Sequence, residues 1–182
     1  MNYPVRKNPR LSYYDYSQNG AYFITICTHN RKYLFSHIDS GSAIQIPSIT
    51  MTQYGKTADS VIKEIPEKYA VKIDNYVIMP NHIHLLIQID DYGENRAIRE
   101  SPLQGRSVIS KVVGYLKMNV SKQMHESGFQ GEIWQRSFHD HIIRGQKDYE
   151  KIWLYIESNP MNWDKDCFYM DPNIGSAQAN RF

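Results

Sequence analysis

The sequence lacks the features of secreted, membrane-spanning or disulfide-stapled proteins. Only two cysteines occur in 182 residues, Cys27 and Cys167, and they lie far apart and in no metal-binding spacing. They provide no disulfide framework and favour a reducing compartment. Residues 1–20 hold no apolar segment like that of a signal peptide, and no hydrophobic run is long enough to cross a membrane. We therefore expect a cytoplasmic protein.

Charge and repetition do not single out a function class. The net charge is only +2, so composition alone does not indicate a nucleic-acid-binding protein. No internal repeat is visible, and no pair of carboxylates indicates a two-metal nuclease. With 182 residues, 41% of them hydrophobic, the chain suits one domain with a sizeable core. Within it we expect an extended arm at 1–20, a core at 21–160 and a tail at 161–182.

What the sequence does have is a histidine pair at the start of a predicted strand. Residues 76–89 form two apolar runs separated by a Met-Pro-Asn turn. Side chains alternate between the two faces of a strand, so His82 and His84 share one face and the opposite face is wholly aliphatic. Two neutral imidazoles placed in this way form half of a metal site. Such pairs also serve packing or hydrogen bonding, and a third ligand has to come from elsewhere. The histidine face consists of His82, His84, Leu86 and Gln88. The aliphatic face consists of Ile83, Leu85, Ile87 and Ile89.

Hydrophobic periodicity predicts the elements around this hairpin. Pro66 is expected to stop the first helix and Ser107 to cap the second. Residues 36–50 are punctuated by Ser, Gly and Pro, so we expect a loop there, with a short β segment at 43–46. The expected elements are a strand at 22–28, a helix from 54, a hairpin at 71–79 and 82–89, a helix from 107, a strand or strand pair at 133–143 and a helix at 147–158. The residues expected to face the core are Tyr22, Ile24 and Ile26, then Tyr54, Ala58, Val61 and Ile65, then Ile109, Val112, Val113, Leu116 and Val120.

The order of these elements predicts the fold class. Strand, helix, strand, strand, helix, strand is the order of the α+β ferredoxin-like βαββαβ fold, with an antiparallel sheet. An extra C-terminal helix follows. Helices would cover one face of the sheet, and the other face, which carries His82 and His84, would be open.

The last predicted helix carries two polar side chains of chemical interest. Tyr155 and Asn159 are four residues apart and lie along one edge of the helix. A phenol and an amide oxygen one turn apart can address one small site, since the amide suits a divalent cation and the phenol suits attack on phosphorus. The alternative is an aromatic core residue followed by an Asn that ends the helix. The buried stripe of this helix is predicted to be Tyr149, Ile152, Trp153 and Ile156.

A set of short segments stands in a specific order along the chain. The segments are Met79-Pro80-Asn81 and His82-Ile83-His84, Trp134-Gln135-Arg136, Asp140-His141-Ile142-Ile143-Arg144, Lys147-Asp148-Tyr149, and Tyr155-Ile156-Glu157-Ser158-Asn159-Pro160. Together they resemble the HUH single-tyrosine transposases, and most closely the REP-associated tyrosine transposases and related small bacterial transposases. The resemblance runs from the N-terminal arm to about residue 166. A His-x-His pair alone is a weak motif, whereas the ordered set is specific.

The resemblance implies a site and a reaction. The family holds its histidine pair on a sheet strand and its nucleophilic tyrosine on a following helix. Here these positions are His82 and His84 for the metal, Tyr155 for the nucleophile and Asn159 for the third ligand, with Mg²⁺ or Mn²⁺ as the ion. The family cuts single-stranded DNA beside imperfect hairpins through a 5′-phosphotyrosine link and then rejoins strands. The protein would act as a monomer or a homodimer.

Basic and aromatic side chains are the predicted contacts to DNA. Cations neutralise phosphates and aromatic rings stack on bases, although each of these residues is equally explained as an ordinary surface or core residue. The predicted nucleic-acid-binding residues are Arg6, Lys7, Arg10, Arg31, Lys32, Trp134, Arg136 and His141. His139 and His141 form a second His-x-His pair, which we expect to support the site or contact DNA rather than to hold the primary metal.

Several alternatives stay open. Tyr115, on the second predicted helix, is the rival nucleophile, although packing suits it better. A metal-dependent phosphodiesterase would use the same ligands without a covalent protein–DNA adduct. A non-catalytic nucleic-acid-binding module shares the ferredoxin-like sheet but needs aromatic residues on its central strands, where this chain has histidines. A structural or interaction protein leaves the predicted ligand set unexplained.

Overall fold

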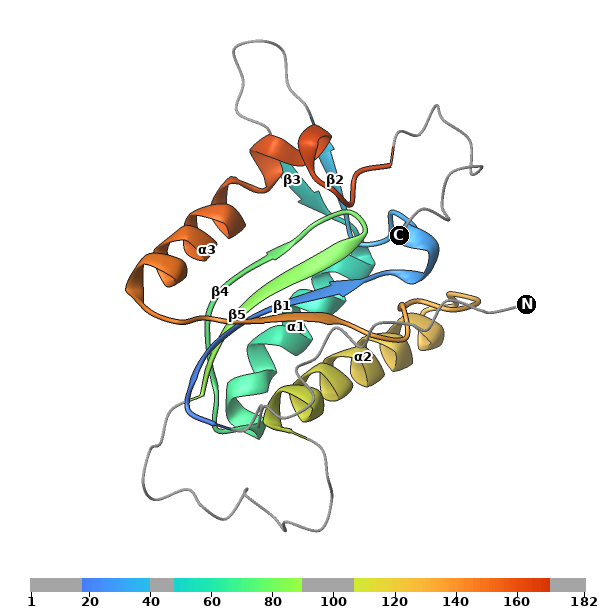
Figure 1. Cartoon of the computed structure of the whole chain (residues 1–182). Helices are drawn as coiled ribbons and strands as arrows, with labels where there is room; N and C mark the ends of the chain where they lie inside the picture. The colour runs from blue at the N-terminus through green and yellow to red at the C-terminus, as the bar shows by residue number, and fades with distance from the viewer. Residues whose placement is uncertain (1–17, 40–47, 90–106, 171–182) are drawn as a thin grey trace, which may run out of the picture.

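The computed structural model describes residues 18–39, 48–89 and 107–170, and within these ranges the centre is a four-stranded antiparallel sheet. Its strand order is β4-β5-β1-β6. Helices α1 and α2 lie on one side of this sheet and α3 on the other (Figure 1). The elements of this core are β1 (Gly20–Cys27), α1 (Gln53–Lys68), β4 (Lys72–Ile78), β5 (His82–Ile89), α2 (Val108–Glu126), β6 (His139–Ile142) and α3 (Gln146–Ser158). The ferredoxin-like prediction is therefore confirmed.

The core lies between the sheet and the two helices α1 and α2. Alternation along β1 and β5 places one row of side chains from each strand in this layer. The predicted core faces of β1, β5 and α2 are confirmed, and Ser107 caps α2 as predicted, with its Oγ accepting a hydrogen bond from the Ser110 N–H at 3.2 Å. The buried residues of these faces are Tyr22, Ile24 and Ile26, then Ile83, Leu85, Ile87 and Ile89, then Ile109, Val112, Val113, Leu116 and Val120.

The first helix runs past the proline that was predicted to stop it. Pro66 lies inside α1, which ends at Lys68. A proline in the last turn removes one backbone donor but leaves the following residues free to stay helical, and the Tyr69 N–H closes the end on Ile65 O. The buried stripe agrees with the prediction at Ala58, Val61 and Ile65, whereas Tyr54 is only partly buried.

Two paired strands, the arms of a hairpin, occupy both ends of the segment predicted as a loop. Strands β2 (Ser36–Asp39) and β3 (Ser48–Met51) pair with each other outside the main sheet. Tertiary contacts override the polar composition here, because the Ser36 hydroxyl donates to Ile78 O and the Thr52 N–H to Phe35 O. The β segment predicted at 43–46 lies outside the described residues. The strand predicted at 133–143 is shorter than expected, since only β6 and an isolated bridge between Thr28 and Trp134 form there.

The sheet face that carries the histidines is not open, which corrects the prediction. Helix α3 and the 3₁₀ helix η3 (Pro160–Lys165) lie over it, and both His82 and His84 are buried. The residues after η3 are tied back to the chain, because Arg31 donates to Cys167 O and Tyr33 donates to Met170 O. Of the four residues in the predicted α3 stripe, only Ile156 is fully buried. None of the helices in the described ranges is long and apolar enough to cross a bilayer.

Candidate active site

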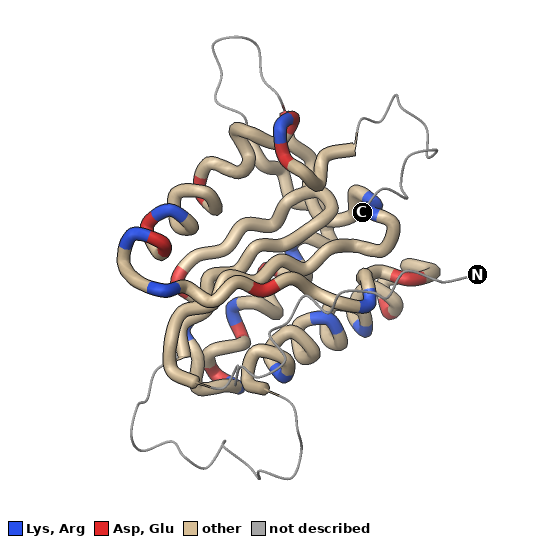
Figure 2. Tube along the Cα trace, viewed as in Figure 1, with Lys and Arg blue, Asp and Glu red and all other residues tan. Residues whose placement is uncertain are grey.

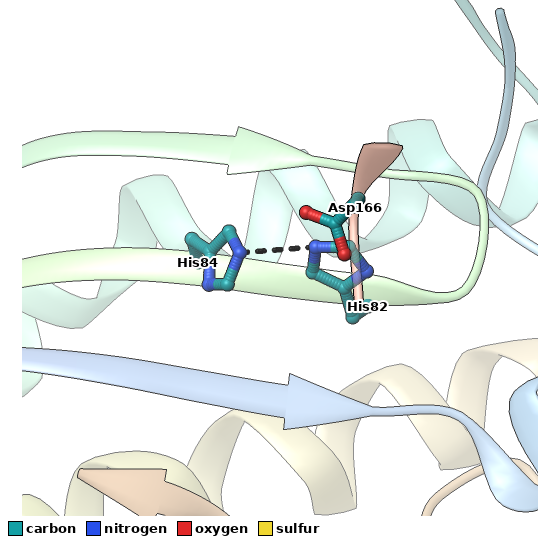
Figure 3. A group of neighbouring side chains, drawn as sticks. All are labelled: His82, His84 and Asp166. Carbon is teal, nitrogen blue, oxygen red and sulfur yellow. Dashed lines mark hydrogen bonds between the residues drawn. The ribbon is translucent and has the colours of Figure 1, made fainter. Parts of the chain in front are cut away.

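The histidine pair begins β5 directly after the turn that joins it to β4. Their Nε2 atoms lie 3.0 Å apart, and the two rings meet edge to face at 4.4 Å (Figure 3). Burial, with a smaller effect of Arg31, lowers the pKa of His82 to about 3. Burial and the neighbouring His82 hold the pKa of His84 well below its ordinary value, against a smaller opposing effect of Asp166. Both imidazoles are therefore neutral near pH 7, which is the form that binds a metal ion.

Two neutral side chains orient these imidazoles. The Asn81 amide nitrogen donates to Phe168 O at 2.8 Å, so its oxygen is the atom that faces His82 Nδ1 at 2.9 Å. An amide oxygen only accepts, so His82 Nδ1 carries the hydrogen and Nε2 keeps its lone pair. Thr25 Oγ1 lies 2.8 Å from His84 Nδ1. When His84 donates to Thr25 from Nδ1, its Nε2 carries no hydrogen and gives up the hydrogen bond to His82 Nε2 that Figure 3 shows. The lone pairs of both Nε2 atoms are then free to bind one metal ion.

Two oxygen-bearing side chains complete the cluster. Asp166, which follows η3, brings a carboxylate oxygen to the pair, and the ligand atoms of His82, His84 and Asp166 lie within 4.8 Å of one another (Figure 3). Asn159, at the end of α3, donates from Nδ2 to Asp166 Oδ2 at 2.8 Å. Its Oδ1 is buried and has no hydrogen-bond partner among the described residues. A buried acceptor left unpaired is costly, and a cation would satisfy it.

The donor set fits a divalent cation. Two neutral imidazole nitrogens together with amide and carboxylate oxygens are ligands that a divalent cation accepts. Sequence reasoning proposed Asn159 and missed Asp166, which it left in the predicted tail at 161–182. The sequence offers little signal for it, because Asp166 lies beyond the ends of both α3 and η3, where no periodic pattern indicates which way a side chain points.

Tyr155 lies at the same cluster. Its hydroxyl is 3.4 Å from His84 Nε2 and 3.3 Å from Asp166 Oδ2. The ring stands edge-on to Phe23, with centroids 5.9 Å apart, and 39% of the residue is exposed. Burial, and then Asp166, raise the pKa of Tyr155 above its ordinary value, so the phenol is protonated at neutral pH. The structure thus brings a candidate nucleophile to the candidate metal ligands.

The rival tyrosine lies elsewhere. Tyr115 is on α2 and packs against the core layer, on the side of the sheet opposite the histidines. Its hydroxyl donates to Glu64 Oε2 on α1 at 2.9 Å, and its ring meets Tyr69 edge to face. This environment agrees with the packing role that the sequence favoured for it.

The predicted DNA contacts are dispersed. Arg31 donates to Cys167 O at 2.8 Å and lies over the Phe168 ring, so it sits beside the cluster. Trp134 is partly buried, donates to Lys117 O and packs on Phe35. His141 bonds Asp148 at the start of α3, whereas Tyr155 lies near its end. Lys32 and Arg136 are exposed. Three further predicted contacts, Arg6, Lys7 and Arg10, lie outside the described residues.

Charged residues do not gather into one large patch in the view of Figure 2. Lys and Arg alternate with Asp and Glu along α3, while the strands at the centre of the molecule carry few charges. Helix α2 has three lysines, Lys111, Lys117 and Lys122, and one acidic residue, Glu126.

Comparison with known proteins gives consistent results. The protein family described as "Transposase IS200 like" matches residues 17–100, a range that includes His82 and His84. An uncharacterized protein of Haemophilus influenzae is 33% identical over 175 residues, covering 91% of this chain and 94% of that protein. A putative REP-associated tyrosine transposase of the same organism is 29% identical over 167 residues, covering 86% of this chain and 84% of that protein.

A solved structure is similar in fold. It is a REP-associated tyrosine transposase bound to a REP hairpin, with a TM-score of 0.57 and 21% sequence identity. The match covers 85% of this chain and 74% of that one.

Proposed function

This chain belongs to the IS200-like transposase family, and from that premise we propose that it cleaves and rejoins single-stranded DNA beside hairpins, with Tyr155 as the nucleophile. The observation that carries the proposal is the position of the Tyr155 hydroxyl, 3.4 Å from His84 Nε2 and 3.3 Å from Asp166 Oδ2. A phenol is a weak nucleophile, so its attack needs stabilisation of the negative charge that develops on the phosphate. The proposed cation ligands lie next to the Tyr155 hydroxyl and could provide it.

Four side chains would hold the cation. His82 and His84 contribute Nε2, Asn159 contributes its unpaired Oδ1, and the Asp166 carboxylate lies beside them. A bound Mg²⁺ or Mn²⁺ supplies positive charge that polarises the phosphoryl group and neutralises charge developing in the transition state. The hydrogen bonds that His82 donates to Asn81 and His84 donates to Thr25 would keep the imidazoles turned toward the ion.

The strand is cut by a displacement at phosphorus. The Tyr155 oxygen forms a bond to the scissile phosphorus, and the bond between phosphorus and the 3′ oxygen breaks. The leaving 3′ oxygen takes up a proton from solvent, so the products are a 5′-phosphotyrosine and a free 3′-hydroxyl. Asp166 accepts a hydrogen bond from the phenol and is the near carboxylate that can take up its proton. Attack by a 3′-hydroxyl on the phosphotyrosine then releases Tyr155 and rejoins a strand.

Access of DNA to the histidines needs local movement. His82 and His84 are fully buried, and Asp166 and Phe168 pack over them. A phosphate would reach a cation held by the histidines only when Phe168, whose ring packs against both imidazoles, shifts. Arg31, Lys32 and Arg136, together with Arg6, Lys7 and Arg10, are the cations proposed to contact the DNA backbone.

Hairpin DNA is the proposed partner, as in the solved structure of similar fold. A single chain supplies the histidines, Asn159, Asp166 and Tyr155, so the proposed site needs no second subunit. The proposed cleavage and rejoining of DNA are expected to take place in the cytoplasm, where bacterial DNA lies. A phosphodiesterase that uses the same ligands without a covalent step is the competing function.

The test uses single-stranded hairpin oligonucleotides from the flanks of the gene, with Mn²⁺, on a denaturing gel. Wild type is expected to give a protein–DNA adduct that Tyr155→Phe loses and Tyr115→Phe keeps. Loss in Tyr115→Phe alone would move the nucleophile to α2. Cleavage without an adduct in any lane would establish the phosphodiesterase instead, and binding without cleavage would leave a DNA-binding protein.

A further inference from the structure

Helix α3, which carries Tyr155, is held on the sheet by few apolar contacts. Within α3, which is described throughout, only Ile156 is fully buried. The residue before its first turn, Gly145, provides no side-chain cap. A helix with so little buried apolar surface can slide or rotate on the sheet. Hydrogen bonds from its side chains to the sheet, here called polar anchors, are needed to fix its position.

One such anchor lies on β4. The Tyr149 hydroxyl donates to Asp74 Oδ2 at 2.8 Å, which joins the first turns of α3 to the neighbouring strand. The Asp74 side chain is only 3% exposed, and Lys72 Nζ lies 2.7 Å from its other oxygen. Burial, and then the hydrogen bond to Asp74, raise the pKa of Tyr149 to about 12, so its hydroxyl stays protonated and donates.

The backbone is distorted at this position. Ile73 pairs with Ile87 and Asn75 pairs with Leu86, so Asp74 is the extra residue of a β-bulge. Ile87 belongs to the core layer, whereas Leu86 points to the opposite face, which α3 crosses. A bulge re-aims a side chain at the cost of ladder hydrogen bonds, and a buried carboxylate is costly in itself. Both costs are incurred at the residue that holds α3.

Geometry links this anchor to the nucleophile. Tyr149 and Tyr155 are six residues apart, which is about 9 Å along a helix axis. A small rotation of α3 about its axis would carry the Tyr155 hydroxyl away from His84 and Asp166. Misplacement of a reacting group by about 1 Å can cost roughly 100-fold in rate.

We propose that the hydrogen bond between Asp74 and Tyr149 is a positioning contact that fixes α3 so that Tyr155 reaches His84 and Asp166. The inference rests on the proposed function. Neither residue would contact DNA or the cation, and their effect on the reaction would pass through α3.

A matched control exists on the same strand. Tyr76 also donates its hydroxyl to a carboxylate, Asp59 Oδ1 on α1, at 2.7 Å. Tyr76→Phe therefore removes a hydrogen bond of the same kind from β4 without touching α3. Comparing Tyr149→Phe with Tyr76→Phe separates positioning of the nucleophile from general loss of stability.

The experiment measures the single-turnover rate of adduct formation at saturating hairpin DNA and Mn²⁺, together with DNA affinity. Tyr149→Phe and Asp74→Ala are expected to slow adduct formation by about 10- to 100-fold, with DNA affinity within about twofold of wild type. Asp74→Asn keeps an oxygen acceptor for the Tyr149 hydroxyl and is expected to restore most of the rate. The double variant Asp74→Ala, Tyr149→Phe should be no slower than Asp74→Ala alone. Equal rates for Tyr149→Phe and Tyr76→Phe would overturn the proposal.

A second readout does not depend on activity. Hydrogen exchange of the α3 amides is expected to rise in Tyr149→Phe and to stay at the wild-type level in Tyr76→Phe. If wild type forms no adduct with any hairpin, the proposed function fails. The hydrogen-exchange data still show whether the bond between Asp74 and Tyr149 holds α3 in place. Unchanged exchange in α3 of Tyr149→Phe would overturn the positioning role whatever the activity.

Discussion

At the scale of single residues, the orientation of the histidines depends on two uncharged neighbours. Asn81 and Thr25 each bond an Nδ1 atom, which leaves the Nε2 atoms facing one another at 3.0 Å. Asn81 is itself held by the carbonyl of Phe168, so the geometry of the imidazoles is tied to the segment that carries Asp166. The order Asn81-His82 thus places a candidate ligand and the group that orients it next to each other in the chain.

Removing either neighbour should weaken metal binding. Asn81→Ala and Thr25→Val are expected to lower Mn²⁺ affinity by about 10- to 100-fold, because an imidazole without its Nδ1 partner is free to rotate. Calorimetric titration of Mn²⁺ into DNA-free protein carrying Tyr155→Phe measures this. Asn119→Ala, which removes an amide bonded to Tyr115 O on α2, is the control. Affinity within twofold of the control would mean that β5 alone orients the rings.

At the scale of secondary structure, α1 shows how closely helix and hairpin approach. Thr52 caps the helix by accepting the Gly55 N–H, and its own N–H donates to Phe35 O. This brings the first turn of α1 against the start of β2. A Cβ at Gly55 would overlap Phe35 O, whereas a Cβ at Gly114 on α2 would meet nothing within 4 Å. The two helical glycines therefore serve different purposes.

Substituting these glycines should change stability in opposite directions. Gly55→Ala is expected to lower the free energy of unfolding by about 1–3 kcal/mol, because the carbonyl of Phe35 is backbone and moves only with the hairpin. Gly114→Ala is expected to raise it by about 0.5–1 kcal/mol, since alanine loses less conformational entropy in a helix. Urea denaturation followed by circular dichroism measures both. A Gly55→Ala variant more stable than wild type would show that the hairpin can move away from the new Cβ without a loss of free energy of unfolding.

At the scale of the whole molecule, the candidate site ties together segments that are distant in sequence. β1 contributes Thr25, β5 contributes His82 and His84, the end of α3 contributes Asn159, and Asp166 follows η3. A cation held by the two histidines, Asn159 and Asp166 would bind the folded chain and not the unfolded one. Its binding free energy would therefore add to the stability of the fold.

Metal removal should therefore lower the melting temperature. With Mn²⁺ at 100 times its dissociation constant, the folded state is expected to gain about 2.7 kcal/mol, which chelation would abolish. His84→Gln should remove this gain, whereas His125→Gln, an exposed position on α2, should keep it. Thermal scans of each variant with Mn²⁺ and with chelator measure the difference. A gain that persists in His84→Gln would place the ion elsewhere.

The sequence by itself determined the parts of this protein that depend on local geometry. Alternation along β1 and β5 assigned their faces, and the helical period of α2 identified its buried stripe, because side-chain direction follows from backbone conformation alone. The spacing of Tyr155 and Asn159 placed both on one helix edge for the same reason. The ordered motifs then identified the family, which no periodicity could do.

Only the tertiary structure decided which segments meet. It brought Asp166 to the histidines, covered the face predicted to be open, paired β2 with β3, and aimed Asp74 at Tyr149 through a bulge. In each of these contacts, the local sequence around one residue gives no indication of the other. They form because the chain folds back over the sheet and buried polar groups must be hydrogen-bonded. Which partner each group finds depends on how the segments pack in three dimensions.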